Sequence, residues 1–99
     1  MFRFTIPQGS KCKYWSHQDE TAFFTWLKAI PGVLKCQGSG RDLIVTLKSK
    51  RLSRGALWEL VALHTRYRLP MRSLAQFETP ANRSWFRSKK MHWHSKVFG

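Results

Sequence analysis

The side chains with the clearest chemical meaning in this sequence are its cations. The chain of 99 residues carries 18 Lys and Arg against 5 Asp and Glu, which gives a formal net charge of +13. So large an excess of one sign repels itself unless an anion offsets it. A strongly basic surface also gains binding free energy when phosphates release their counterions. The composition therefore predicts a polyanion, and nucleic acid first, as the partner.

The cations gather at three places along the chain. One group precedes a predicted helix, where phosphates are favoured because free N–H groups and the helix dipole add to the side-chain charge. A second group (Arg66, Arg68 and Arg72) surrounds the far end of that helix, and a third lies in a C-terminal segment rich in aromatic residues. We predict nucleic-acid contacts from the first and third groups and from one tryptophan of the helix, namely Lys48, Lys50, Arg51, Arg54, Trp58, Arg83, Arg87, Lys89 and Lys90.

Aromatic side chains decide whether such a surface binds bases or only phosphates. Exposed rings beside cations stack on unpaired bases, at about 1–3 kcal/mol per base. Trp58 is a candidate because it follows Arg54 by four residues and lies off the predicted apolar stripe of its helix. For Trp85, Phe86 and Trp93, docking of the C-terminal segment on the domain is favoured over stacking on a ligand, and both interpretations stay open.

No metal-binding or catalytic pattern is found among the remaining polar residues. Cys12 and Cys36 form no C-x₂₋₄-C pair, and His92 and His94 form no H-x₃₋₅-H pair, so the spacing typical of zinc sites is missing. P-loop, Rossmann and nucleophile-elbow motifs are also missing. We expect no metal, no cofactor and a non-catalytic protein.

Two other functions stay open beside nucleic-acid binding. The first is docking on an acidic protein partner, as an interaction protein or accessory subunit. The second is a small metal-free ribonuclease, in which Arg or Lys would act with one of the histidines His17, His64, His92 and His94.

The cysteine count and the apolar runs give an expectation for the compartment. Two cysteines are too few for a disulfide framework, so free thiols in a reducing cytosol are expected, with a bridge between them as the alternative. The longest purely apolar run, residues 60–63, is far shorter than the roughly 20 residues of a membrane span. We therefore expect a soluble, cytoplasmic protein without a membrane span.

The first half of the chain shows the periodicity of a strand, a helix and a hairpin. Residues 2–6 alternate between apolar and polar, which predicts a half-buried strand. Ser16 fits the N-cap of a helix over roughly residues 17–30, whose apolar stripe recurs at helical spacing. Residues 33–36 and 43–47 flank a loop with two glycines, which is typical of a β-hairpin.

The second half completes the predicted fold. A helix begins after Ser53 and runs to about Tyr67, and residues 71–77 alternate again, which favours a short strand over a helical turn. Thr79 and Pro80 suit the start of a third short helix. The resulting β-α-β-β-α-β order predicts an α+β, ferredoxin-like βαββαβ sandwich, with an antiparallel sheet and two helices on one face. We predict one α+β domain over 1–78 and a basic aromatic C-terminal extension over 79–99, packed on it as part of the same unit.

Overall fold

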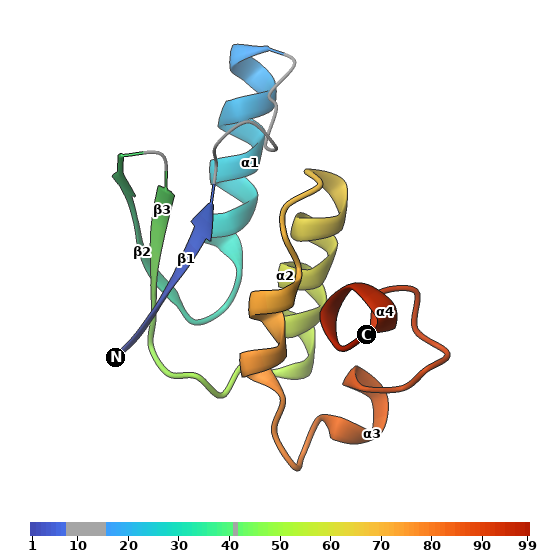
Figure 1. Ribbon diagram of the computed structural model, residues 1–99. Coiled ribbons are helices and arrows are strands. Elements are labelled where there is room, and N and C mark those ends of the chain that lie inside the picture. The colour runs from blue at the N-terminus through green and yellow to red at the C-terminus, as the bar shows by residue number, and fades with distance from the viewer. Residues whose placement is uncertain (8–15, 41) are drawn as a thin grey trace.

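The sheet of this protein has three antiparallel strands (Figure 1). The computed structural model describes residues 1–7, 16–40 and 42–99. The middle strand, β3 (Asp42–Leu47), pairs with β1 (Phe2–Pro7) on one side and with β2 (Val33–Ser39) on the other. The predicted hairpin of β2 and β3 is confirmed, and its strands run closer to the turn than predicted. Gly40 in this turn has φ 61°, in the left-handed region that favours glycine.

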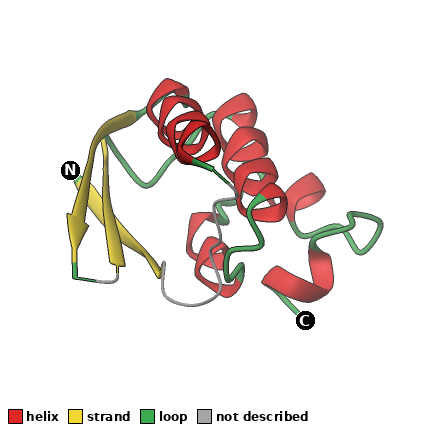
Figure 2. Cartoon of the chain, turned by 90° about the horizontal axis from the view of Figure 1, so that it is seen from above, coloured by secondary structure: helices red, strands yellow, loops and turns green. Residues whose placement is uncertain are grey.

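The alternation along β3 decides which face of the sheet meets the core. Leu43, Val45 and Leu47, which alternate along the strand, are at most 2% exposed. On the opposite face, Arg3 and Lys35 are the register partners that flank Thr46. Figure 2 shows the helices gathered on one side of the sheet, so none of the described helices covers this opposite face.

Two long helices cover the core face, and both begin at the predicted cap. α1 (His17–Ala29) follows Ser16, whose Oγ accepts a hydrogen bond from a first-turn N–H at 3.1 Å. α2 (Arg54–Arg66) follows Ser53, whose Oγ accepts a corresponding bond at 3.1 Å. Each hydroxyl satisfies an N–H that the helix itself leaves without a partner, which fixes where the helix starts.

The fourth predicted strand is replaced by a 3-10 helix, η1 (Arg72–Phe77). Met71, Leu74 and Phe77 are buried, and their spacing matches the roughly three residues per turn of a 3-10 helix. The apolar alternation that favoured a strand placed Leu74 on the polar side, although its side chain is fully buried. Within the described residues the fold is therefore α+β with three strands, and the four-stranded ferredoxin-like sheet was a wrong prediction.

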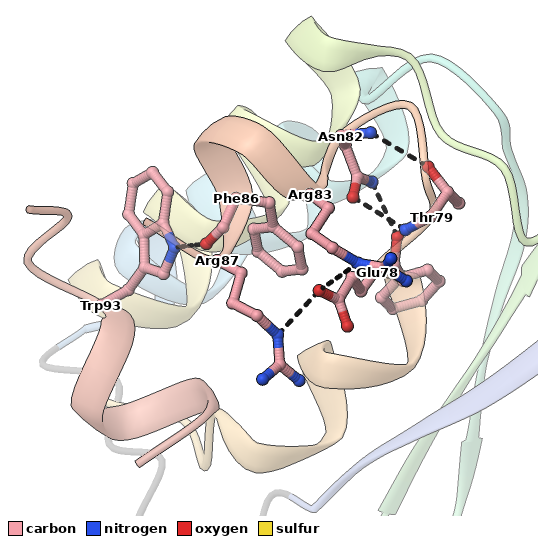
Figure 3. A network of polar contacts seen from close by, with 8 residues as sticks. Glu78, Thr79, Asn82, Arg83, Phe86, Arg87 and Trp93 are labelled. Atoms are coloured by element: carbon pink, nitrogen blue, oxygen red, sulfur yellow. Dashed lines mark hydrogen bonds and ion pairs between the residues drawn. The ribbon is translucent and has the colours of Figure 1, made fainter. Parts of the chain in front are cut away.

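The C-terminal segment packs against α2 and η1 through two short helices, α3 (Arg83–Phe86) and α4 (His94–Val97). Phe86, Trp93 and Val97 are buried in the same cluster as the core residues of the sheet and of the long helices. Trp93 Nε1 donates a hydrogen bond to Phe86 O at 2.8 Å (Figure 3). The polar atom of the indole is thereby satisfied inside apolar surroundings.

His64 of α2 is a titratable side chain inside the core. Its Nδ1 donates a hydrogen bond to Leu60 O at 2.8 Å, while its Nε2 is buried without a partner among the described residues. Burial lowers the pKa of His64 from 6.5 to about 4, and the hydrogen bond to Leu60 opposes this shift. The ring is therefore neutral at neutral pH.

We expect acid to destabilise the fold through His64. The unfolded chain binds a proton near pH 6.5 and the folded chain only near pH 4, so stability is lost as the pH falls through this window. The free energy of unfolding should fall there by about 1.4 kcal/mol per pH unit. Urea titrations across the window should show a flatter pH dependence for His64→Leu. A slope in His64→Leu equal to that of the parent would contradict the assignment to His64.

Candidate nucleic-acid interface

The connection between β3 and α2 carries the first group of predicted contacts on a well-anchored turn. Lys48 N donates a hydrogen bond to Gly32 O at 2.8 Å, which ties the connection to the turn between α1 and β2. Ser49 Oγ accepts a hydrogen bond from Arg51 N at 3.2 Å and closes a tight local turn. Ser53 then caps α2. The connection is thus held at both ends and in the middle.

Residues 48–54 form a ridge between two hollows, which we call the basic ridge. The smaller hollow, of about 170 Å³, lies between the ridge and the α1–β2 turn. The larger one, of about 500 Å³, lies between the ridge and residues 78–81. Lys48 lines the smaller hollow, Lys50 lines the larger one, and Arg51 lines both. Cationic side chains are therefore present on both flanks of the ridge.

No ion pair between described residues joins the cations of the basic ridge to a carboxylate. The side chains concerned, all exposed, are Lys48, Lys50, Arg51 and Arg54. Among the residues that the structure describes, the ion pairs of Lys and Arg all involve Glu78, and none reaches the ridge. The charge of the ridge is therefore available to an anion from outside.

The start of α2 adds to this positive field. The first turn of α1 contains Asp19 and Glu20, which complement the positive end of the helix dipole. The first turn of α2 contains no acidic residue and begins instead with Arg54. The partial positive charge of the α2 N-terminus thus stays uncompensated by the helix and lies beside the ridge cations.

Trp58 is held by the C-terminal segment instead of standing free on α2. Its ring lies parallel to that of Trp85, with centroids 5.8 Å apart, and meets the buried Trp93 edge-on at 4.8 Å. The Arg54 guanidinium lies over the Trp85 ring at 5.2 Å. The predicted contact residues Arg54 and Trp58 are therefore brought together, but both contact the Trp85 ring of the protein itself.

Arg83 and Arg87, predicted as part of a second clamp, are paired within the chain. Glu78 Oε2 accepts hydrogen bonds from Arg83 Nε at 3.2 Å and from Arg87 Nε at 2.7 Å (Figure 3). The hydrogen bond from Arg87 is the main cause that lowers the pKa of Glu78. The Arg87 guanidinium also lies over the Phe98 ring at 4.6 Å. These two cations hold the C-terminal segment in place as well as facing solvent.

Lys89 and Lys90 are separated from the ridge. Both are exposed on the connection between α3 and α4. Figures 1 and 2 show this connection at the end of the molecule farthest from the sheet. The nine predicted contact residues thus divide into the four ridge cations, Trp58 packed against Trp85, a pair bound by Glu78, and two outlying lysines.

The sequence did not predict that Glu78 binds Arg83 and Arg87, because this pairing depends on a turn before α3. Thr79 N donates a hydrogen bond to Asn82 Oδ1 at 2.8 Å, and Asn82 N donates to Thr79 Oγ1 at 3.2 Å. This reciprocal turn delays the start of α3 to Arg83, three residues later than the predicted start at Pro80. Because the chain turns here, no helical spacing rule links Glu78 to the two arginines it binds.

The cysteines offer little nucleophilic chemistry in the described part of the chain. Cys36 is a free, half-buried thiol on β2. Burial raises the pKa of this thiol, and the nearby Lys28 opposes the shift. The thiol form therefore predominates at neutral pH. Cys12 lies outside the described residues.

Comparison of the chain with known protein families, curated proteins and solved structures finds no match. The function is therefore argued from the geometry of the ridge and its surroundings. Among the described helices, none is long and apolar enough to cross a membrane. The predicted cytoplasmic location stays a prediction.

Adding a methyl group at Gly32, in the turn that anchors the ridge, should lower the stability of the protein. Gly32 has φ 96°, and an L-residue in the left-handed region costs about 1–2 kcal/mol. We expect Gly32→Ala to lower the free energy of unfolding by about this amount in a denaturant titration. Gly38→Ala is the matched control, because a Cβ there meets nothing within 4 Å and its φ is ordinary. Equal stability of both variants and the parent would show that this turn does not need a glycine.

Proposed function

We propose that the protein is a small, non-catalytic module that binds nucleic acid and related polyanions through phosphate contacts. The observation that carries the proposal is the basic ridge, whose exposed cations form no ion pair within the described part of the chain and lie at the start of α2. Phosphates are favoured at such a place by side-chain charge and by the helix dipole together. Contacts to phosphates carry no sequence information, so little sequence preference is expected.

A second candidate is docking on an acidic protein partner. The helix-free face of the sheet carries Arg3 and Lys35 on either side of Thr46. Leu34, at the irregular pairing beside Lys35, is 56% exposed. Exposed cations on this face would complement the charge of an acidic partner. The ridge favours nucleic acid more strongly, because it concentrates four exposed cations within seven residues, none of them in an ion pair with another described residue.

The ribonuclease alternative gains no support from the placement of the histidines. His64 is 1% exposed and cannot contact RNA in the folded state. His17 begins α1, whereas His92 and His94 lie near the start of α4, on a different part of the fold (Figure 1). A general acid and a general base must both lie within hydrogen-bond reach of the reacting group.

Charge reversal on the ridge tests the proposal. We expect Arg51→Glu with Arg54→Glu to weaken binding to a labelled polynucleotide and to flatten the plot of log K against log salt. Each neutralised phosphate contributes a slope of about −0.9, so the slope should change by about two such units. Fluorescence anisotropy at several salt concentrations gives both quantities.

The matched control carries the same charge change at the other end of α2. Arg66→Glu with Arg72→Glu alters two exposed cations there. We expect this control to keep most of the salt dependence. Equal loss in both double variants would mean that binding follows net charge alone, and the ridge would not be the site.

Glu78→Gln should have the opposite effect on binding. Glu78 lines the larger hollow and holds Arg83 and Arg87, so its removal frees two cations and reduces repulsion of phosphates. We expect tighter binding and a steeper salt dependence in the same anisotropy assay. Glu20→Gln removes the same formal charge from the first turn of α1. If both variants tighten binding equally, Glu78 has no local influence on the ridge.

A further inference from the structure

Two aromatic rings beside the basic ridge, among those that the structure describes, are already covered by its cations. Lys50 Nζ lies over the Phe2 ring at 5.9 Å, and Phe2 meets Phe77 edge-on at 5.8 Å. Arg54 lies over the Trp85 ring at 5.2 Å. Single-strand binding proteins use free ring faces beside cations to stack unpaired bases. A base that stacked on either ring would first have to displace Lys50 or Arg54, the cation proposed to bind phosphate there.

The Trp58–Trp85 pair is also unsuited to accept a base between its rings. The two rings lie parallel within 3°, and Trp58 is fixed edge-on against Trp93, which is fully buried. Inserting a base would separate the pair and pull the C-terminal segment away from α2. Stacking on bases therefore costs tertiary packing at this pair of rings.

The shape of the ridge offers cations to two rows of phosphates at once. Lys48 lies in one flanking hollow and Lys50 in the other, with Arg51 between them. A groove of double-stranded nucleic acid is bordered by two phosphate rows, one from each strand. A single strand presents one row and would satisfy only one flank of the ridge.

The ridge is also held in its shape before anything binds. Lys48 N is bonded to Gly32 O, and the Ser49–Arg51 turn closes the next residues. Leu52 is half-buried and lies beside Gly32, so an apolar anchor follows the two polar ones along the ridge. A preformed element loses little conformational entropy on binding, which suits a ligand that is itself stiff, as a duplex is.

The geometry points to a double-stranded nucleic acid as the ligand, with the basic ridge entering a groove. Lys48 and Lys50 then contact phosphates of opposite strands, and Arg51 bridges between them. This inference rests on the proposed function and adds to it the duplex form of the ligand. The recognition is of backbone shape and charge, without stacking or extrusion of bases. DNA and RNA duplexes share the two phosphate rows and differ in groove width.

The test compares duplexes and single strands that carry equal numbers of phosphates. Labelled duplex DNA, duplex RNA and single strands of twice the duplex length are titrated with the intact protein at one salt concentration, by anisotropy. We expect at least one duplex to bind about tenfold more tightly than either single strand. Whichever of the two duplexes binds more tightly shows whether DNA or RNA is the preferred ligand. Equal affinity for duplexes and single strands would overturn the inference and leave the proposed function intact, whereas absence of binding in every arm would remove both.

Separate variants of the two flanks give a second, independent readout. Lys48→Ala and Lys50→Ala should each weaken duplex binding and each lower the salt slope by about one unit. Lys96→Ala, an exposed residue of α4, is the matched control and should change neither quantity. Circular dichroism and thermal unfolding of each variant show that the fold is retained. If only one flank affects duplex binding, the ridge does not span a groove.

Discussion

Burial of the Trp93 indole is the interaction on which the C-terminal third of the molecule depends. The ring is fully buried, meets Trp58 of α2 edge-on and donates its N–H to Phe86 O. With Trp93 in place, α3 and α4 close over α2, and Trp85 comes to lie under Arg54. The wall of the larger hollow opposite the basic ridge, residues 78–81, leads directly into this docked segment. The shape of the candidate site therefore follows from packing that is distant in sequence.

The second constraint is the excess of positive charge. With a formal net charge of +13, the chain has too few carboxylates to pair its cations. The ion pairs seen between described residues converge on Glu78, and several other cations lie over aromatic rings. Ring contacts keep a cation attached to the surface without neutralising it. The fold thus anchors cationic side chains while leaving their charge to act on an external anion.

Local signals in the sequence predicted local structure well. The caps at Ser16 and Ser53 and the buried face of β3 follow from hydrogen bonding and alternation within a few residues, and all are found. The ridge cations lie together because they are adjacent in sequence. By contrast, a segment as short as residues 71–77 does not distinguish alternation from a period of three, so the prediction of a strand there was wrong. The binding of two arginines by Glu78 depends on the turn before α3, which follows no helical spacing. The stacking of Trp58 on Trp85 arises only when distant segments meet.

The claim that external phosphates bind at the basic ridge is tested most directly by NMR. Backbone amide spectra of the ¹⁵N-labelled protein, recorded during titration with a short duplex, report which residues sense the ligand. The account predicts that the largest shifts fall on residues 48–54 and on the hollow walls at Gly32 and Thr79. Largest shifts on the helix-free face of the sheet, around Arg3 and Lys35, with the ridge unchanged, would contradict it.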